Sequence, residues 1–239
     1  MRWINLATVL LLAAPGAAQE NEAEKLFRAM EKKIRAARSL EIVFEADATD
    51  PTPGAANFKG QALFGEGNRF RIEVKVSYEG KKTGGMIASD GKTLYQKDDE
   101  APAKTQPAHA EDAERLRAFV GRGGILAGLG SFADLATTEP KKDFDLEKTW
   151  ALTDFKLGAK DKIGAREAQI VECTLTIVMK GRKTDTAKMA VWIDTQTQLP
   201  LKRRLEAKWG KETTTTYLET YSTFNPDAKI DAKMFELPK

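Results

Sequence analysis

The feature that most constrains the fold is residues 69–76, where apolar and charged side chains alternate. Phe70, Ile72, Val74 and Val76 are the apolar members. A period of two is typical of a β-strand that has one apolar face and one face in water. Such strands belong to antiparallel sheets, because the strands of parallel sheets are usually covered on both faces and form continuous apolar runs. The chain must therefore supply, or recruit, a cover for this apolar face.

The same alternation recurs along the chain and predicts about ten strands in two groups. They are expected at residues 40–46, 57–64, 68–78, 84–89, 93–96, 149–157, 168–179, 188–194, 201–209 and 213–224. Short turn-forming sequences join most of them, and Asp90-Gly91 is a strong signal for a tight turn. The sequence shows no β-α-β alternation and no repeat of fixed period, so one long antiparallel sheet with strong curvature is the simplest arrangement.

Two segments are expected to be helical and to cover this sheet. Residues 22–38 carry an apolar stripe at helical spacing, and Asn21 is placed to cap the first turn. Residues 111–120 form the second helix, which a glycine-rich apolar segment follows at residues 121–132. The charged, proline-bearing residues 98–110 between strand and helix are predicted to be a loop. We therefore expect a mainly β fold with two helical covers, and a final helical turn that begins after Asp231.

The N-terminus has the pattern of a cleaved secretory signal. Met1-Arg2 is followed by an apolar run and by the small residues Gly16 and Ala18. The run is about half of the ~20 residues that a membrane-spanning helix needs. We expect residues 1–18 to be removed and residues 19–239 to form one domain. Because Cys173 is the only cysteine, neither an internal disulfide nor lipid attachment at the cleavage site is expected, and the mature chain should be soluble and exported, for example periplasmic.

Charge and motifs favour binding over catalysis. The 38 basic and 35 acidic residues nearly balance, which does not favour a nucleic-acid partner. Lys202-Arg203-Arg204 is interpreted as a solvated strand face, with docking to an anionic membrane surface as the alternative. His109 is the only histidine, and no nucleophile motif or zinc spacing accompanies it. The glycines of residues 121–132 lack the spacing of a phosphate loop. No cofactor and no metal are expected, and a hydrolase with an unrecognised site is the remote alternative.

Three short stretches resemble the LolA-type periplasmic carriers of outer-membrane lipoproteins, of which this chain would be a divergent member. They are Gly60-Gln-Ala-Leu-Phe-Gly-Glu-Gly-Asn-Arg-Phe70, Ala88-Ser-Asp-Gly-Lys-Thr-Leu-Tyr95 and the terminal Phe235-Glu-Leu-Pro238. The order of signal, helix, strands, mid-chain helical segment and strands is similar as well. The resemblance implies an incomplete, half-open β-barrel with an N-terminal helix and a helical lid over its concave face. The cavity between them would hold acyl chains in transit between membranes.

The resemblance implies a wall and a lid. The predicted lipid-binding wall consists of Phe44, Phe64, Phe70, Ile72, Val74, Met86, Leu175, Ile177 and Met189. The predicted lid consists of Leu116, Phe119, Val120, Ile125, Leu126, Leu129 and Phe132. One departure stands out, because Glu66 occupies the position at which the family has an arginine that latches the lid.

The expected partners are lipoprotein acyl chains or other lipids, together with donor and acceptor proteins at the membranes, and the chain is expected to be a monomer. An envelope sensor or binding module on the same fold, without transfer of cargo between membranes, is the alternative function.

Overall fold

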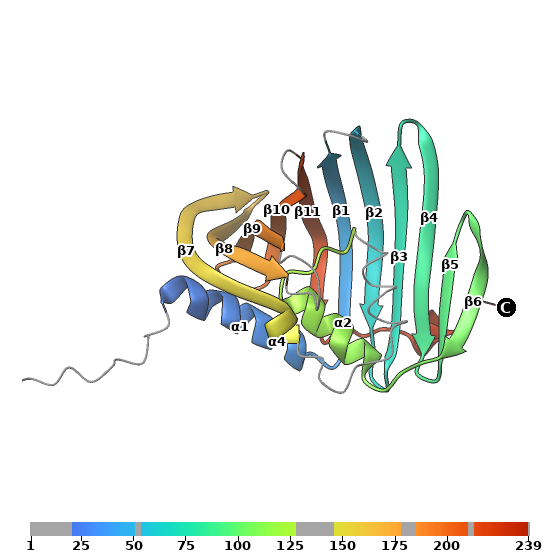
Figure 1. Cartoon of the computed structure of the whole chain (residues 1–239). Helices are drawn as coiled ribbons and strands as arrows, with labels where there is room; N and C mark the ends of the chain where they lie inside the picture. The colour runs from blue at the N-terminus through green and yellow to red at the C-terminus, as the bar shows by residue number, and fades with distance from the viewer. Residues whose placement is uncertain (1–20, 51–53, 128–145, 178–184, 210–212, 239) are drawn as a thin grey trace, which may run out of the picture.

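The computed structural model describes residues 21–50, 54–127, 146–177, 185–209 and 213–238. A single antiparallel sheet of 11 strands dominates it, in the order β6-β5-β4-β3-β2-β1-β11-β10-β9-β8-β7 (Figure 1). The first half of the sheet comprises β1 (Leu40–Asp50), β2 (Gly54–Phe64), β3 (Arg69–Tyr78), β4 (Lys81–Asp90), β5 (Thr93–Asp98) and β6 (Ala101–Pro107). The second half comprises β7 (Trp150–Ile163), β8 (Arg166–Ile177), β9 (Asp185–Asp194), β10 (Pro200–Trp209) and β11 (Thr213–Pro226).

The pairing of β1 with β11 joins the two halves in the middle of the sheet. The edges are β6 and β7, which lie at opposite ends of the strand order and do not pair with each other. The predicted single, curved and unclosed antiparallel sheet is therefore confirmed. Irregular pairing contributes to its curvature, since the register shifts once in β1 beside Phe44 and twice in β7, and an extra residue bends a strand.

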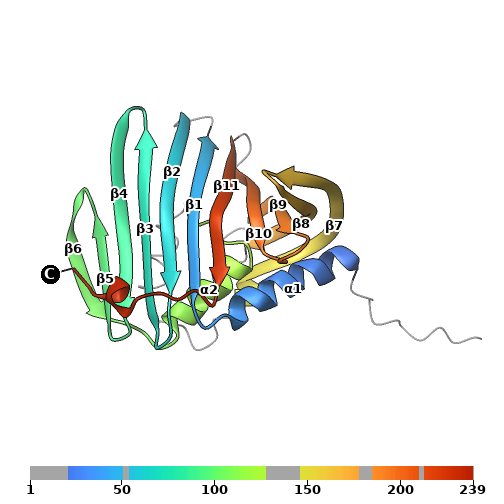
Figure 2. The same ribbon diagram turned by 180° about the vertical axis from the view of Figure 1, so that it is seen from behind.

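The helices lie against the lower part of the sheet. They are α1 (Glu22–Ala36), α2 (Asp112–Gly121), α4 (Leu146–Thr149) and the single 3₁₀ turn η1 (Ala232–Phe235). The two predicted caps are confirmed: the Asn21 side chain accepts a hydrogen bond from the Glu24 amide at 2.8 Å, and that of Asp231 accepts one from the Lys233 amide at 3.0 Å. Helix α1 runs beside β7 and β8, and α2 lies in front of the lower ends of β11 and β1 in Figure 1 and behind them in Figure 2.

Cross-strand pairing places the apolar residues of β1–β4 on one face. Ile42 pairs with Ala62, Ala62 with Ile72, and Ile72 with Ile87. All four side chains are fully buried, and they belong to the cluster that also contains the buried stripe of α1. We call this the inner face. The alternation predicted for residues 69–76 is confirmed, because Phe70, Ile72 and Val74 are buried on the inner face while Arg71 and Glu73 between them lie on the other face.

The loop predicted for residues 98–110 is wrong over most of its length. Residues 101–107 form β6, which pairs with β5, and they are largely exposed. Pro102 and Pro107 suggested a loop because proline cannot donate to a sheet. A strand at the edge of a sheet has one row of amides without a neighbour, so proline is tolerated there. The sequence could not show that this segment would be the edge.

The buried thiol of Cys173 offers a test of the packing. Burial raises its pKa to about 12, although the positive charges of Arg28 and Arg122 act to lower it. At pH 8 only about one thiol in ten thousand would then be ionised. We expect a thiol-directed chromogenic reagent to label the folded protein at pH 8 at the rate of its unfolding, and to label it within seconds in denaturant. Rapid labelling of the folded protein would contradict this packing.

Candidate functional site

Most of the predicted wall lies on the inner face. Phe44, Phe64, Phe70, Ile72, Val74, Leu175 and Met189 are at most 2% exposed and share one hydrophobic cluster. Ile177, at the end of β8, is half-buried and packs against the same cluster. These residues come from β1, β2, β3, β8 and β9, so the strand order gathers side chains that are more than 100 positions apart in sequence.

Met86 is the exception and its assignment to the wall was wrong. It pairs with Glu73, whereas the neighbouring Ile87 pairs with Ile72 and is fully buried. Met86 therefore lies on the outer face. Gly84 and Gly85 precede it and carry no side chains that would show which face is apolar. A shift of one residue reverses the face of every side chain in a strand.

The described members of the predicted lid pack against the same cluster. Leu116, Phe119 and Val120 belong to α2, and Ile125 and Leu126 follow it. All five are buried. Leu129 and Phe132 lie outside the described residues. The structure thus brings together the inner face, α2 and the segment 123–127.

The N-terminus of α2 is held by the turn between β2 and β3. The Asn68 side chain donates to the His109 carbonyl and accepts from the Ala113 amide, both at 2.8 Å. Asp112 is fully buried and accepts from the His109 amide at 2.9 Å and from Arg115 at 2.6 Å. Burial raises the pKa of Asp112, with the Arg115 charge opposing. Asn68 has a φ of 63°, a conformation that asparagine tolerates well. This turn therefore holds α2 through Asn68, although it lacks the arginine of the carriers.

The C-terminus of α2 is held by a buried ion pair. Arg122 is 3% exposed, and its Nη1 lies 3.0 Å from the Glu31 carboxylate on α1. Its Nε donates to the Trp150 carbonyl at 2.6 Å. Phe119 packs edge-on against the Trp150 ring, with ring centroids 4.7 Å apart. Helix α2 is consequently tied at both ends to rigid elements, and it does not resemble a freely hinged lid.

The segment 123–127 follows α2 and packs closely against the inner face. The Gly123 amide donates a hydrogen bond to the Val120 carbonyl, and the Gly124 amide donates one to the Phe119 carbonyl. Gly123 has a φ of +100°, and a Cβ there would overlap the Met189 sulfur. A Cβ on Gly124 would overlap the Phe119 ring. Only glycine permits this close approach of the backbone to the inner face.

A buried polar cluster on β10 and β11 receives the segment. Arg203 and Glu219 are cross-strand neighbours, and both are fully buried. Glu219 accepts from the Ala127 amide at 2.7 Å and from the Tyr221 hydroxyl at 2.6 Å. Arg203 Nη1 donates to the Gly124 carbonyl at 3.4 Å. We call Arg203, Glu219 and Tyr221 the inner polar cluster, and it fixes both ends of residues 124–127 to the sheet.

Burial dominates the electrostatics of the inner polar cluster. It raises the pKa of Glu219, against the hydrogen bonds from Tyr221 and Ala127 and the charge of Arg203. It also raises the pKa of Tyr221 well above its ordinary value. Arg203 was expected on a solvated face, and that interpretation was wrong. Leu205 and Ala207 follow Arg203 at a spacing of two, and they pair with Met189 and Ala187 of the inner face. This alternation indicates that Arg203 points to the inner face, and the three consecutive basic residues made it hard to recognise in the sequence.

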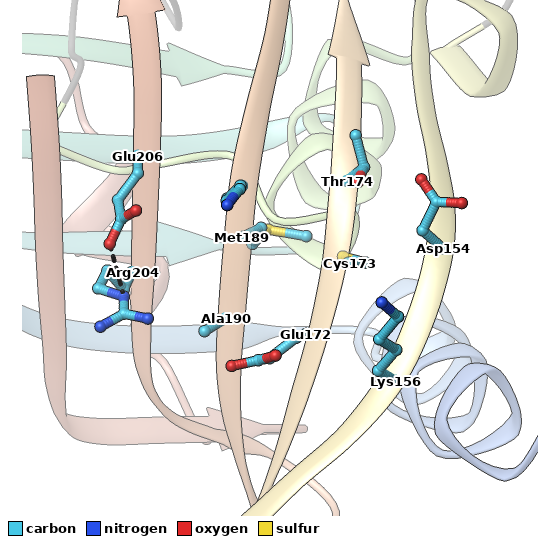
Figure 3. A pocket seen from close by; sticks show the side chains of 10 residues that line it. Asp154, Lys156, Glu172, Cys173, Thr174, Met189, Ala190, Arg204 and Glu206 are labelled. Carbon is cyan, nitrogen blue, oxygen red and sulfur yellow. Dashed lines mark ion pairs between the residues drawn. The ribbon is translucent and has the colours of Figure 1, made fainter. Parts of the chain in front are cut away.

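A separate cavity of about 310 Å³ opens on the outer face of β7–β10 (Figure 3). Charged side chains of both signs line it, among them Asp154, Lys156, Glu172 and the ion pair between Arg204 and Glu206 at 3.3 Å. This lining does not suit an apolar chain. Two wider depressions lie along the rim near the turn between β2 and β3, and both include Arg38, Gly65 and Glu66.

Two searches over the described residues bear on other functions. Within these ranges, no group of three or more histidine, cysteine, aspartate or glutamate side chains is placed to hold a metal ion. None of the helices in the same ranges has the length and apolar character needed to cross a membrane.

Comparisons with known proteins give similarity of fold at low identity. No model of a known protein family matches the chain, and no curated protein matches it. The structure of the Pseudomonas aeruginosa MucA/MucB complex is similar at 15% identity and a TM-score of 0.43, over 91% of this chain and 62% of the matched one. The LolA superfamily protein NE2245 from Nitrosomonas europaea is similar at 12% identity and a TM-score of 0.37, over 90% and 97%.

A putative outer membrane lipoprotein-sorting protein domain from Vibrio parahaemolyticus is similar at 11% identity and a TM-score of 0.34, over 89% of this chain and 97% of that one. The chain is thus similar to distant LolA-like proteins, and it spans 62% of the length of the MucA/MucB chain that it matches. At these scores the similarities assign no function and no residue roles, which must come from the contacts within the chain.

The buried pair at the end of α2 can be tested by substitution. We expect Arg122→Met to lower the free energy of unfolding by about 3 kcal/mol. It leaves the buried Glu31 carboxylate with Arg28 as its remaining ion-pair partner and removes the donor to the Trp150 carbonyl. The matched control is Arg35→Met, which removes an exposed ion pair to Glu147 and should cost less than about 1 kcal/mol. Urea denaturation measures both. Equal losses in the two variants would show that the Arg122 pair does not fix α2.

The inner polar cluster predicts a pH dependence of stability. The pKa of Glu219 is raised in the folded chain from its ordinary value of 4.5. Its contribution is therefore fully present below pH 4.5 and is lost as the pH rises through the folded pKa. We expect Glu219→Gln, which keeps the shape of the side chain, to become more stable relative to the parent protein between pH 4 and pH 8. Urea denaturation across this range checks it, and a stability difference independent of pH would refute it.

Proposed function

We propose that this protein is an exported carrier that binds the acyl chains of lipoproteins or other lipids on its inner face, beneath the segment 123–127. The observation that carries the proposal is the attachment of this segment. It covers a continuous apolar face, and its polar contacts to the sheet are a few backbone groups, those of Gly124, Leu126 and Ala127, that meet Arg203 and Glu219. Glycines at 123 and 124 allow the backbone to change direction there.

The free energies involved suit reversible binding. Removing ~10 methylenes of an acyl chain from water is worth roughly 8 kcal/mol at about 0.8 kcal/mol each. That corresponds to a dissociation constant of about 1 μM before the costs of ordering are counted. Hydrogen bonds within the protein contribute only about 1 kcal/mol each to holding the cover closed. The apolar burial of Ile125 and Leu126 also holds it, and an acyl chain that displaces them buries apolar surface of its own on the same face. A ligand could therefore displace the cover and still be released, and no chemical reaction is required.

The position of Val76 allows the inner face to be tested without destroying the core. Val76 is half-buried, pairs with Phe58, and lies on the inner face. Phe70 is fully buried, so a charge there would be expected to unfold the protein. We expect mature protein purified from cells to carry lipid that mass spectrometry detects, and Val76→Asp to lose most of it. The matched control is Met86→Asp on the outer face, which should retain the lipid.

Circular dichroism would show that both variants are folded. Equal lipid in folded Val76→Asp and Met86→Asp, or no lipid in the parent protein, would contradict binding on the inner face.

A binding module that holds its ligand without transferring it is the second candidate. The anchoring of α2 at both ends, through Asn68 and Arg122, favours it, because little of the cover is then left to open. Transfer of a labelled lipoprotein from donor to acceptor vesicles separates the candidates. A carrier accelerates the transfer in proportion to its concentration, whereas a module of the second kind binds the lipoprotein and leaves the rate unchanged.

A further inference from the structure

The inner polar cluster contains a positive charge that the rest of the protein compensates only in part. Arg203 is fully buried, and its guanidinium is a cation. Both carboxylate oxygens of Glu219 are occupied, one by the Ala127 amide and one by the Tyr221 hydroxyl. Among the described residues no salt bridge joins Glu219 to Arg203, although they are direct cross-strand neighbours and the Arg203 charge acts on Glu219. The positive charge of Arg203 is thus only partly compensated.

The hydrogen bonds of Arg203 leave one edge of the guanidinium vacant. Nη1 donates to the Gly124 carbonyl at 3.4 Å, while Nε and Nη2 are buried and make no hydrogen bond of 3.5 Å or less. The Tyr221 hydroxyl also interacts with the guanidinium, but at a longer distance. A buried charged donor without a partner loses its hydration and gains no hydrogen bond in return. The Tyr221 ring, 5.6 Å from the guanidinium carbon, offsets only part of that cost. Buried donors without hydrogen-bond partners are rare in folded proteins, so those of Arg203 call for an explanation.

The two vacant donors are the pair that binds an oxyanion. Nε–H and the adjacent Nη2–H point in parallel from one edge of the planar guanidinium and match the two oxygens of a carboxylate or phosphate. Burial raises the pKa of Glu219, which weakens the nearest negative charge that would compete with such a ligand. Because the segment 123–127 lies over Arg203, an anion reaches this edge when the segment moves aside.

The surroundings indicate what the anion is attached to. Arg203 pairs with Val191 on one side, and Glu219 on the other side pairs with Ala46 of β1. From there the apolar inner face continues through β1 and β2 to Val74 on β3. The distance from β10 to β3 is four strand spacings, roughly 19 Å at about 4.8 Å each. That is comparable to the length of an extended long acyl chain.

We propose that Arg203 is the binding site for the oxyanion head of a single-chain amphiphile whose acyl chain lies along the inner face. The inference rests on the proposed function and specifies its ligand: a carboxylate or a phosphate at the end of a long apolar chain. Nε and Nη2 of Arg203 hold two of its oxygens, and the Gly123–Ala127 backbone closes over the head. Neutral lipids would bind through their chains alone.

Delipidated mature protein titrated with matched ligands tests this. We use oleate, oleyl phosphate and the uncharged oleyl alcohol, all below their critical micelle concentrations, and follow binding by calorimetry. We expect at least one of the two anions to bind about tenfold or more tightly than the alcohol, since charge-assisted hydrogen bonds are the stronger kind. The comparison of oleate with oleyl phosphate identifies the head group.

Substitution locates the effect. Arg203→Met should reduce the affinity for the preferred anion to that for oleyl alcohol and leave the affinity for the alcohol unchanged. Arg203→Lys should recover only part of the preference, because an ammonium cannot offer two parallel donors. The matched control is Arg204→Met, on the outer face one residue away, which should keep the full preference.

The outcomes separate this inference from the proposed function. If the parent protein binds oleate, oleyl phosphate and oleyl alcohol equally, the Arg203 site is refuted while binding of acyl chains stands. If none of the three binds, both fail. The affinities of the parent protein for the two anions and for the alcohol test the anion preference even if Arg203→Met does not fold. Should Arg203→Met fold and keep the preference for the anion, the site lies elsewhere and the inference is overturned.

Discussion

The structure depends on a face of the sheet that cannot be left in water. Antiparallel strands with alternating side chains create one apolar face, and each Å² of it that is covered contributes about 25 cal/mol to stability. In a closed barrel the sheet would cover itself. Here β6 and β7 do not pair, so helices and connecting segments must supply the cover. Helix α1 covers the end near β7 and β8, and α2 and the segment 123–127 lie over the middle.

The parts of this cover differ in how firmly they are attached. Helix α2 is secured by Asn68 at one end and by the buried pair of Arg122 and Glu31 at the other. The segment that follows touches the sheet through hydrogen bonds at Gly124 and Ala127. Local opening is easiest where few contacts must break. The segment is short, and its apolar side chains Ile125 and Leu126 are buried against the sheet. A ligand that takes its place must therefore replace that apolar burial with its own.

Polar groups in such a face are costly, and their placement is therefore informative. If the interface between the inner face and its cover served stability alone, apolar side chains would be expected throughout it. Replacing a buried charge with an apolar group often stabilises a protein. The inner polar cluster instead places a guanidinium and a carboxyl under the cover. Glu219 accepts a hydrogen bond from the Ala127 amide of the covering segment, whereas Nε and Nη2 of Arg203 have no hydrogen-bond partner. Stability alone does not account for Arg203, and recognition of a ligand does.

The sequence predicted those features that local pattern determines. Alternation in residues 69–76 gave the correct inner face for Phe70 and Ile72, and Asn21 and Asp231 were correctly identified as caps. Prediction failed where the local signal was absent or ambiguous. The glycines before Met86 have no side chains from which its face could be predicted. Two prolines made the edge strand β6 resemble a loop. The run of three basic residues suggested that Arg203 faces water. The pair of Glu31 and Arg122 joins positions 91 residues apart, which no local pattern can reveal.

The central claim is that an acyl chain lies on the inner face of the sheet. Nuclear Overhauser contacts between a protonated acyl ligand and the methyl groups of an otherwise deuterated protein test it most directly. Ile72 and Val74 lie on the inner face, and Val43 of β1 lies on the outer one. The ligand methylenes should show contacts with the methyl groups of Ile72 and Val74 and none with Val43. Contacts with Val43 instead, or none with either inner residue under saturating ligand, would contradict the claim.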